Sequence, residues 1–218
     1  MSQVAFISSN FAIAEGAMTA GLRFFAGYPI TPVSDLMEYL ASELPRRGGV
    51  VFQAEDEIGA INAIIGASWT GAKAMTATSG PGFSLMAESL GFAAMTETPI
   101  VIAYVMRAGP STGIATATGQ GDVMQSRWAS HGPYELVVYA PSTAQEAYDL
   151  TIEAFNVSEA LRIPVIVLSD HVLAHVRERV VLRKPPEVRV VNRKRPRSPP
   201  EDLSLIHISE PTRPLYIS

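Results

Sequence analysis

Residues 50–83 read VVFQAEDEIGAINAIIGASWTGAKAMTATSGPGF and contain a strand, a helix, a second strand and the start of a second helix. The strands are expected at Val50–Gln53 and Lys73–Thr78, on either side of a helical pattern at Asp56–Thr70. Glycine and proline after Thr78 mark a turn into the next helix. Strand–helix–strand units of this length form parallel strand pairs, so the stretch predicts an α/β fold.

The same alternation runs through most of the chain. Further strands are expected at Leu22–Ala26, Ile100–Val105, Glu135–Tyr139 and Val165–Leu168. Further helices are expected at Ala12–Ala20, Ser34–Leu44, Phe83–Thr96 and Thr143–Ala160. Ser34 and Asp56 are expected as N-caps. Most of these strands are apolar on both faces, which predicts a doubly wound, mostly parallel sheet with helices on both faces.

Composition excludes several classes of site and partner. The 218 residues include 47% hydrophobic and 17% charged residues and carry a net charge of −4, which is typical of a globular chain without a nucleic-acid-binding field. The absence of cysteine excludes disulfides, thiolate metal sites and an iron–sulfur cluster on this chain. No signal-peptide pattern and no long apolar span occur, so we expect a cytoplasmic protein with no nucleic acid or membrane partner.

The composition changes towards the C-terminus. We assign residues 1–184 to one domain and residues 185–203, rich in proline and arginine, to a linker whose basic cluster we interpret as a solvated strap between domains. Residues 204–218 fit neither, and Ser204–Arg213 back-translates into a transposon-end sequencing adapter. We therefore predict that 204–218 is an artefact and that a second domain is missing.

Glu57 is the most informative carboxylate. At 100° per residue it falls on the same helical stripe as Ile61, Ile64 and Ser68, which predicts a buried side chain, whereas its acidic neighbours can satisfy the helix start. Acids at a helix N-terminus also simply complement the helix dipole. The sharper interpretation is a carboxyl group whose pKa is tuned to hold or exchange a proton.

Candidate ligand-binding residues follow two further predicted strands. Arg107 follows the strand Ile100–Val105 and precedes AGPSTG, where an arginine either grips a carboxylate or phosphate or lies on a surface loop. TSGPGFS opens the helix after Thr78, but it lacks a phosphate-loop pattern and fits a tight turn equally well. His171 and His175 have helical spacing without a third ligand, so no metal site is expected.

The stretch GYPITP, residues 27–32, follows another strand end. Pro29 and Pro32 hold the residues before them extended, which fixes Tyr28 and Thr31. Thr31, Glu57 and Arg107 all sit at the same edge of a parallel sheet, and we therefore expect them to form one site.

These segments resemble the α subunit of the 2-oxoacid:ferredoxin oxidoreductases, in its first domain. The matching blocks are AIAEGAMTAGLRFFAGYPITP, FQAEDEIGAINAIIGASWTGAKAMTATSGPGFSLM, TETPIVIAYVMRAGPSTG, QGDVMQSRWASHG and QEAYDLTIEAFNVSEALRIPVIVLSD. The resemblance covers roughly residues 10–184, and GPSTG, the QGD step and RWASHG look most like the 2-oxoglutarate branch.

The resemblance implies the pyrimidine-binding half of a thiamine diphosphate site. A β subunit would bring the diphosphate half with Mg²⁺ and a [4Fe-4S] cluster, and γ and δ subunits occur in some relatives. The implied reaction is oxidative decarboxylation of a 2-oxoacid, here 2-oxoglutarate, to an acyl-coenzyme A with electrons passing to ferredoxin. Without its β subunit the chain would be inactive.

Site roles also follow from the resemblance. Glu57 matches the glutamate that hydrogen-bonds the pyrimidine nitrogen, and Tyr28, Pro29 and Ile30 match the cofactor-binding turn. Thr31 and Arg107 match residues that bind the substrate. The alternatives are a non-catalytic nucleotide- or flavin-binding electron-transfer domain, supported by TSGPG and the basic linker, and a non-oxidative decarboxylase of the same cofactor class.

Overall fold

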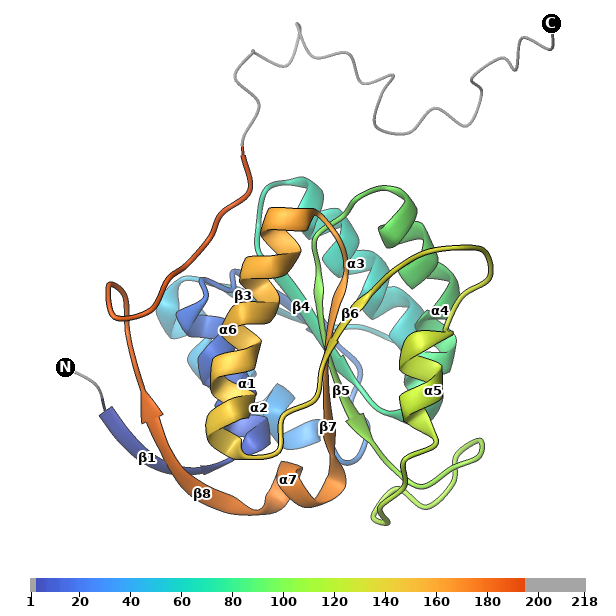
Figure 1. The fold of residues 1–218 in the computed structure, drawn as a ribbon, viewed down its shortest axis with the longest axis horizontal. Coiled ribbons are helices and arrows are strands. Elements are labelled where there is room, and N and C mark those ends of the chain that lie inside the picture. The colour runs from blue at the N-terminus through green and yellow to red at the C-terminus, as the bar shows by residue number, and fades with distance from the viewer. Residues whose placement is uncertain (1–2, 195–218) are drawn as a thin grey trace, which may run out of the picture.

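Six parallel strands form the central sheet of the computed structural model, which describes residues 3–194 (Figure 1). The strands are β2 (Phe24–Gly27), β3 (Val50–Gln53), β4 (Ala74–Thr78), β5 (Val101–Met106), β6 (Val137–Tyr139) and β7 (Val165–Asp170). They lie in the order β3-β2-β4-β5-β7-β6, and every neighbouring pair is parallel. All six carboxyl ends therefore lie at one edge of the sheet.

Helices cover both faces of this sheet (Figure 1). They are α1 (Ser9–Thr19), α2 (Ser34–Glu43), α3 (Glu57–Trp69), α4 (Gly80–Met95), α5 (Asp122–Arg127), α6 (Ala144–Leu161) and α7 (His171–His175). Helices α1, α2 and α6 pack on one face and α3 and α4 on the other. Along β5, Val101 and Val105 join the first core while Ile102 and Tyr104 join the second. The predicted doubly wound sheet is confirmed.

The predicted strands and longer helices agree with the structure to within about three residues at each end, and two details of the helix starts are wrong. Helix α4 begins at Gly80 rather than Phe83, because Pro81 is tolerated in the first turn of a helix. The N-cap of α2 is Val33, not Ser34, since the Val33 N–H donates to the Ile30 carbonyl in the preceding turn. Asp56 is an N-cap, as predicted, and accepts from the Gly59 N–H at 2.7 Å.

A small antiparallel ribbon, not predicted from the sequence, flanks α1 and α6. It pairs β1 (Gln3–Ser8) with β8 (Arg177–Leu182). The short helices α5 and α7 were also not predicted. Such short segments carry too few periods for a hydrophobic pattern to mark them.

Residues 187–194, which we call the strap, lie on the domain at the edge where the strands begin. Asn156 of α6 pairs with both sides of its backbone, donating to the Arg189 carbonyl at 3.0 Å and accepting from the Val191 N–H at 2.8 Å. Arg193 forms an ion pair with Glu159 of α6 at 2.5 Å. The solvated interpretation is therefore wrong for Arg193, whose partners are buried. The domain and linker boundaries remain predictions, and residues 195–218, including the predicted artefact, lie outside the described residues.

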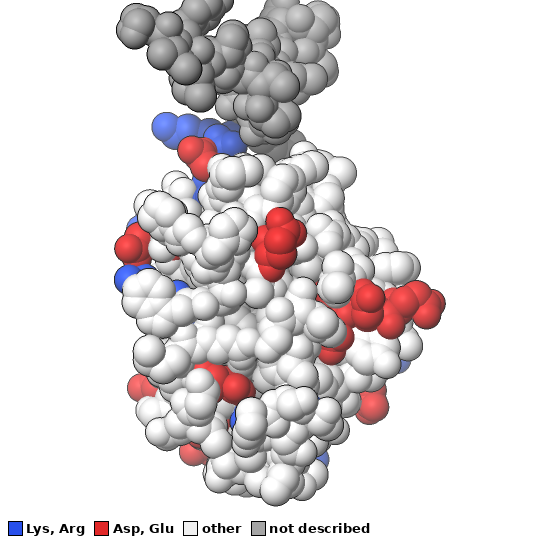
Figure 2. Space-filling view, turned by 90° about the vertical axis from the view of Figure 1, so that its right-hand side faces the viewer, with Lys and Arg blue, Asp and Glu red and all other residues white. Residues whose placement is uncertain are grey.

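The side of the molecule formed by α4 and α5 carries few charges (Figure 2). Exposed apolar side chains on these two helices and the segment after them include Leu85, Met95, Met124 and Trp128. Within residues 3–194, no helix is long and apolar enough to cross a membrane.

Candidate active site at the carboxyl edge of the sheet

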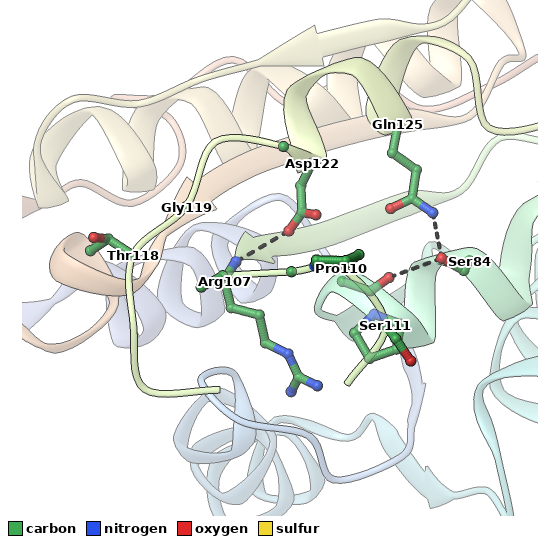
Figure 3. A pocket seen from close by; sticks show the side chains of 13 residues that line it. Ser84, Arg107, Pro110, Ser111, Thr118, Gly119, Asp122 and Gln125 are labelled. Carbon is green, nitrogen blue, oxygen red and sulfur yellow. Dashed lines mark hydrogen bonds between the residues drawn. The ribbon is translucent and has the colours of Figure 1, made fainter. Parts of the chain in front are cut away.

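A cleft of about 770 Å³ opens beyond the carboxyl ends of β4 and β5 (Figure 3). In open α/β sheets this edge is where ligands bind. The cleft is lined by the start of α4, the segment after β5 and helix α5, through Gly80, Pro81, Ser84, Arg107, Ala108, Gly109, Pro110, Ser111, Thr118, Gly119, Gly121, Asp122 and Gln125.

Arg107 is the one cation among the residues that line this cleft. Its side chain is 5% exposed and bridges two loops, with Nη1 donating to the Thr31 carbonyl and Nη2 to the Thr112 carbonyl, both at 2.8 Å. Nε is buried and without a partner among the described residues, and no carboxylate within that range pairs with the guanidinium. A guanidinium has five N–H donors, and two of them make hydrogen bonds with the described residues.

The GYPITP turn lies directly against Arg107. The Val33 N–H closes the turn on the Ile30 carbonyl at 2.9 Å, around a cis Thr31–Pro32 bond. From the other side, Asn10 of α1 donates to the Pro32 carbonyl at 2.9 Å. The turn is thus held by Arg107 and Asn10, and both hold it through backbone carbonyls.

The side chains of the turn face outwards. Thr31, Pro29 and Tyr28 are exposed, and Ile30 is partly buried against the core of α1 and α2. Their hydroxyl and apolar groups are open to a ligand or a partner chain. The expected link between the Thr31 and Arg107 side chains is replaced by a link from Arg107 to the Thr31 backbone.

Glu57 begins α3 and is buried, 5% exposed. Ile61, Ile64 and Ser68 of the same stripe are also buried, whereas Glu55 and Asp56 are exposed, as the periodicity predicts. Burial raises the pKa of the Glu57 carboxyl, and the nearby Asp56 charge raises it further. Its own backbone N–H and the charge of Arg107 lower the pKa in part without reversing the shift.

Gly82, in the first turn of α4, makes room for Glu57. A Cβ at this position would come within 2.5 Å of Glu57 Oε1 and would also clash with the Thr78 hydroxyl. Glycine therefore lets the start of α4 approach the carboxyl group closely. TSGPGFS is thus a close-packed helix start that covers Glu57, in addition to lining the cleft through Gly80 and Pro81.

The structure brings the three predicted side chains to one edge but not into one cleft. Arg107 and the Thr31 backbone are hydrogen-bonded, whereas Glu57 interacts with Arg107 only through its charge and is absent from the cleft lining. Glu57 lies under the α4 start, beside Gly82.

Three polar residues of the cleft were not assigned from the sequence. Asp122 accepts from the Arg107 backbone N–H at 3.1 Å, and Gln125 donates to Ser84 at 2.5 Å (Figure 3). The signal was the QGD step after a glycine-rich loop, where an aspartate can begin a helix.

The loop between Arg107 and α5 folds back on Ala108. The Ala108 N–H donates to the Ala117 carbonyl at 2.9 Å, and the Ile114 N–H donates to the Ala108 carbonyl at 3.0 Å. Gly113 has φ +58°, and a Cβ there would clash with the Ala108 carbonyl oxygen, so the turn requires glycine. This fold positions Thr112 to accept from Arg107.

The histidine pair is separate from the cleft lining. The rings of His171 and His175 lie edge to face at 4.9 Å, and His175 lies 3.9 Å from Asp35. Residues 3–194 contain no group of three or more His, Cys, Asp or Glu side chains positioned to hold a metal ion.

Comparisons with known proteins agree with the fold. Residues 15–217 match the family described as "Pyruvate flavodoxin/ferredoxin oxidoreductase, thiamine diP-bdg". The 2-oxoglutarate synthase subunit KorA of Methanocaldococcus jannaschii is 57% identical over 198 residues, which are 91% of this chain and 54% of that protein. The ketoisovalerate oxidoreductase subunit VorB of Methanothermobacter thermautotrophicus is 44% identical over 173 residues, or 79% of this chain and 49% of that protein.

A solved structure extends the likeness to three dimensions. The 2-oxoglutarate:ferredoxin oxidoreductase from Magnetococcus marinus, with 2-oxoglutarate, coenzyme A and succinyl-CoA bound, superposes with a TM-score of 0.87 at 38% identity. It covers 98% of this chain, which spans 38% of that chain and about half the length of the curated relatives it matches. The chain therefore belongs to the pyruvate flavodoxin/ferredoxin oxidoreductase family, in its thiamine diphosphate-binding part.

Proposed function

We propose that the chain is the α-subunit part of a 2-oxoacid:ferredoxin oxidoreductase that supplies the pyrimidine side of a thiamine diphosphate site. The reaction proposed is the oxidative decarboxylation of 2-oxoglutarate to succinyl-coenzyme A, with electrons passing to ferredoxin. The observation that carries this proposal is the buried Glu57 carboxyl with a raised pKa at the ligand-binding edge of the sheet.

The described residues fit the pyrimidine end of such a cofactor. Glu57 is a buried carboxyl group with no ion-pair partner among them, which suits a proton shared with a ring nitrogen. Gly82 leaves the carboxyl group free of the side chain that any other residue would place against it. The turn of the exposed Tyr28 and Pro29 and the partly buried Ile30 supplies an apolar surface at the same edge of the sheet.

Each proposed role follows from what surrounds the residue. Burial raises the pKa of the Glu57 carboxyl, so this group keeps its proton to a higher pH than an exposed glutamate would and can share that proton with a pyrimidine nitrogen. Arg107 offers its unpaired donors to the substrate's 1-carboxylate, and Thr31 offers its exposed hydroxyl. Thiamine diphosphate, when bound, would supply the carbanion chemistry of decarboxylation.

Partner chains complete the proposal. The relatives are named as subunits, and the side over α4 and α5, on which the few visible charges are mostly acidic, exposes apolar side chains of the kind that mark protein interfaces. We assign the [4Fe-4S] cluster to a β subunit because this chain has no cysteine, and Mg²⁺ to the same subunit because that subunit would hold the diphosphate half of the cofactor. In this proposal coenzyme A accepts the acyl group and ferredoxin accepts the electrons. The complex is proposed to work in the cytoplasm.

The test is Glu57→Gln in the oxidoreductase assembled from the full-length α chain and its β subunit. We expect coenzyme A-dependent reduction of ferredoxin by 2-oxoglutarate to fall by about 100-fold or more, because glutamine cannot exchange the proton. The complex should assemble unchanged, as measured by size-exclusion chromatography. Glu55→Gln, two residues before Glu57 and exposed, is the matched control and should act like wild type.

Near-normal turnover of Glu57→Gln would contradict the proposed role of the carboxyl group. Flavin that copurifies with the wild-type chain, without thiamine diphosphate, would favour an electron-transfer domain instead. Release of CO₂ without ferredoxin reduction would indicate a non-oxidative decarboxylase.

A further inference from the structure

The two charged side chains that line the cleft lie together at one end of it. Asp122 accepts from the backbone N–H of Arg107, whereas the Arg107 guanidinium donates to the carbonyls of Thr31 and Thr112. The other residues that line the cleft are uncharged. A substrate group that lies away from Arg107 and Asp122 is therefore selected by uncharged groups.

Those uncharged groups are hydrogen-bonding side chains. Gln125 donates from Nε2 to the Ser84 hydroxyl at 2.5 Å (Figure 3). Its Oε1 accepts from the Tyr104 hydroxyl at 2.9 Å. Because Tyr104 is buried in the core, it fixes which way the amide points. The second N–H of the amide forms no hydrogen bond with the described residues. No branched aliphatic or aromatic side chain lines the cleft.

Arg107 and Gln125 line the same cleft, so one bound molecule can contact both. An acid whose 1-carboxylate lies at Arg107 can therefore extend within the cleft towards Gln125. A five-carbon 2-oxodicarboxylate carries a second carboxylate at its far end, which can accept from the open N–H of the amide.

We propose that Gln125 is a specificity-determining residue that donates to the far carboxylate of a five-carbon 2-oxodicarboxylate, with Ser84 as its support. This inference rests on the proposed function and adds to it the group that selects the substrate. A branched apolar oxoacid would leave the Gln125 amide and the Ser84 hydroxyl desolvated without a ligand acceptor, which costs binding free energy.

The experiment compares 2-oxoglutarate with 2-oxoisovalerate in the assembled oxidoreductase. Gln125→Leu should lower kcat/KM for 2-oxoglutarate about 10- to 100-fold and leave kcat/KM for 2-oxoisovalerate unchanged or raised, because one hydrogen bond to a charged group is lost. Gln125→Glu keeps the shape but adds a like charge, so it should reduce kcat/KM for 2-oxoglutarate further. Gln120→Leu, which changes an exposed glutamine outside the cleft lining, is the control and should leave the ratio of the two constants unchanged.

The outcomes separate this inference from the proposed function. If the wild-type complex turns over no 2-oxoacid, both the proposed function and the role of Gln125 are contradicted. A wild-type complex that turns over 2-oxoglutarate, with an unchanged substrate ratio in both Gln125 variants, overturns the role of Gln125 alone. Equal losses for both substrates would show that Gln125 acts only on structure, which also contradicts the inference.

Discussion

Arg107, which is buried, and Arg193, which is partly buried, lie at opposite edges of the sheet and differ in how many of their donors are paired. Arg193 of the strap makes five side-chain hydrogen bonds, two to Glu159, two to Ser68 and one to the Ala72 carbonyl. Arg107 makes two, and its Nε has no partner among the described residues. The two residues are of the same type, so only the number of paired donors separates them.

The difference separates a structural guanidinium from one that is open to a ligand. Burying a charged group costs free energy because the group loses its contacts with water, and hydrogen bonds and ion pairs inside the protein offset this cost. Arg193 recovers it within the chain, and its partners Glu159 and Ser68 are buried as well. Arg107 leaves donors open at the edge of a cleft, so we interpret it as the residue that binds an anion.

The largest effect is expected for Arg107→Met on catalysis. The variant should lower kcat/KM for 2-oxoglutarate by about 100-fold or more in the assembled oxidoreductase, because a charge-assisted contact to the substrate is lost. Its Tm should change little, since the two carbonyls it releases belong to the exposed Thr31 and Thr112 and can bind water. Arg127→Met, which removes an exposed ion pair with Glu135, is the control. A kcat/KM within threefold of wild type would contradict the interpretation that Arg107, unlike Arg193, binds the substrate.

Arg193→Met should act on stability instead. We expect the free energy of unfolding to fall by about 3 kcal/mol or more in denaturant titrations, because Glu159 is left as an unpaired buried charge. Trypsin should also cut the strap faster. Lys194→Met, which is exposed, should leave both unchanged. A loss below about 1 kcal/mol would show that the ion pair adds little to the domain.

Asn10→Ala should produce an intermediate effect at the catalytic edge. Its amide donates to the Pro32 carbonyl and to Asp35, so removal should cost about 1–2 kcal/mol of stability and loosen the turn that carries Thr31. If Asn10 positions Thr31, KM for the oxoacid should rise more than kcat falls. Asn62→Ala, exposed on α3, is the control. Equal loss of kcat and no change in KM would contradict a positioning role.

Glu57→Gln should give the smallest change, in the pH dependence of Tm. Since burial raises the Glu57 pKa, the folded state binds more protons than the unfolded state above the usual glutamate pKa, and stability falls as pH rises through that window. The variant lacks this penalty, so its Tm should exceed that of wild type at neutral pH. The gap should close at a pH below the usual glutamate pKa. A gap that is independent of pH would indicate a cause other than ionisation.

The sequence predicted the sheet well because periodicity and strand composition are local. The alternation along β5 and the Glu57 stripe on α3 both follow from spacing alone. The ribbon of β1 and β8 was not predicted, because its partners lie far apart in the sequence and its strands are short. Pairing between distant segments leaves no local signal.

At the site, the sequence predicted which residues gather but not how they bond. Thr31 and Arg107 meet through a backbone carbonyl, a contact that residue identity does not encode. The sequence also did not predict the contrast between Arg107 and Arg193. The number of paired donors on Arg193 depends on how the strap lies against the domain. The role of Gln125 required the Tyr104 hydroxyl that orients it.

The most direct test of the comparison is the shift in Tm that 2-oxoglutarate causes in the assembled oxidoreductase. A ligand that binds only the folded state stabilises it by about 2.7 kcal/mol at 100 times its Kd. At a saturating concentration, 2-oxoglutarate should raise the Tm of wild type and of Arg193→Met by the same amount and leave that of Arg107→Met unchanged. An equal rise in all three proteins would contradict the assignment of Arg107 as the arginine that binds the substrate.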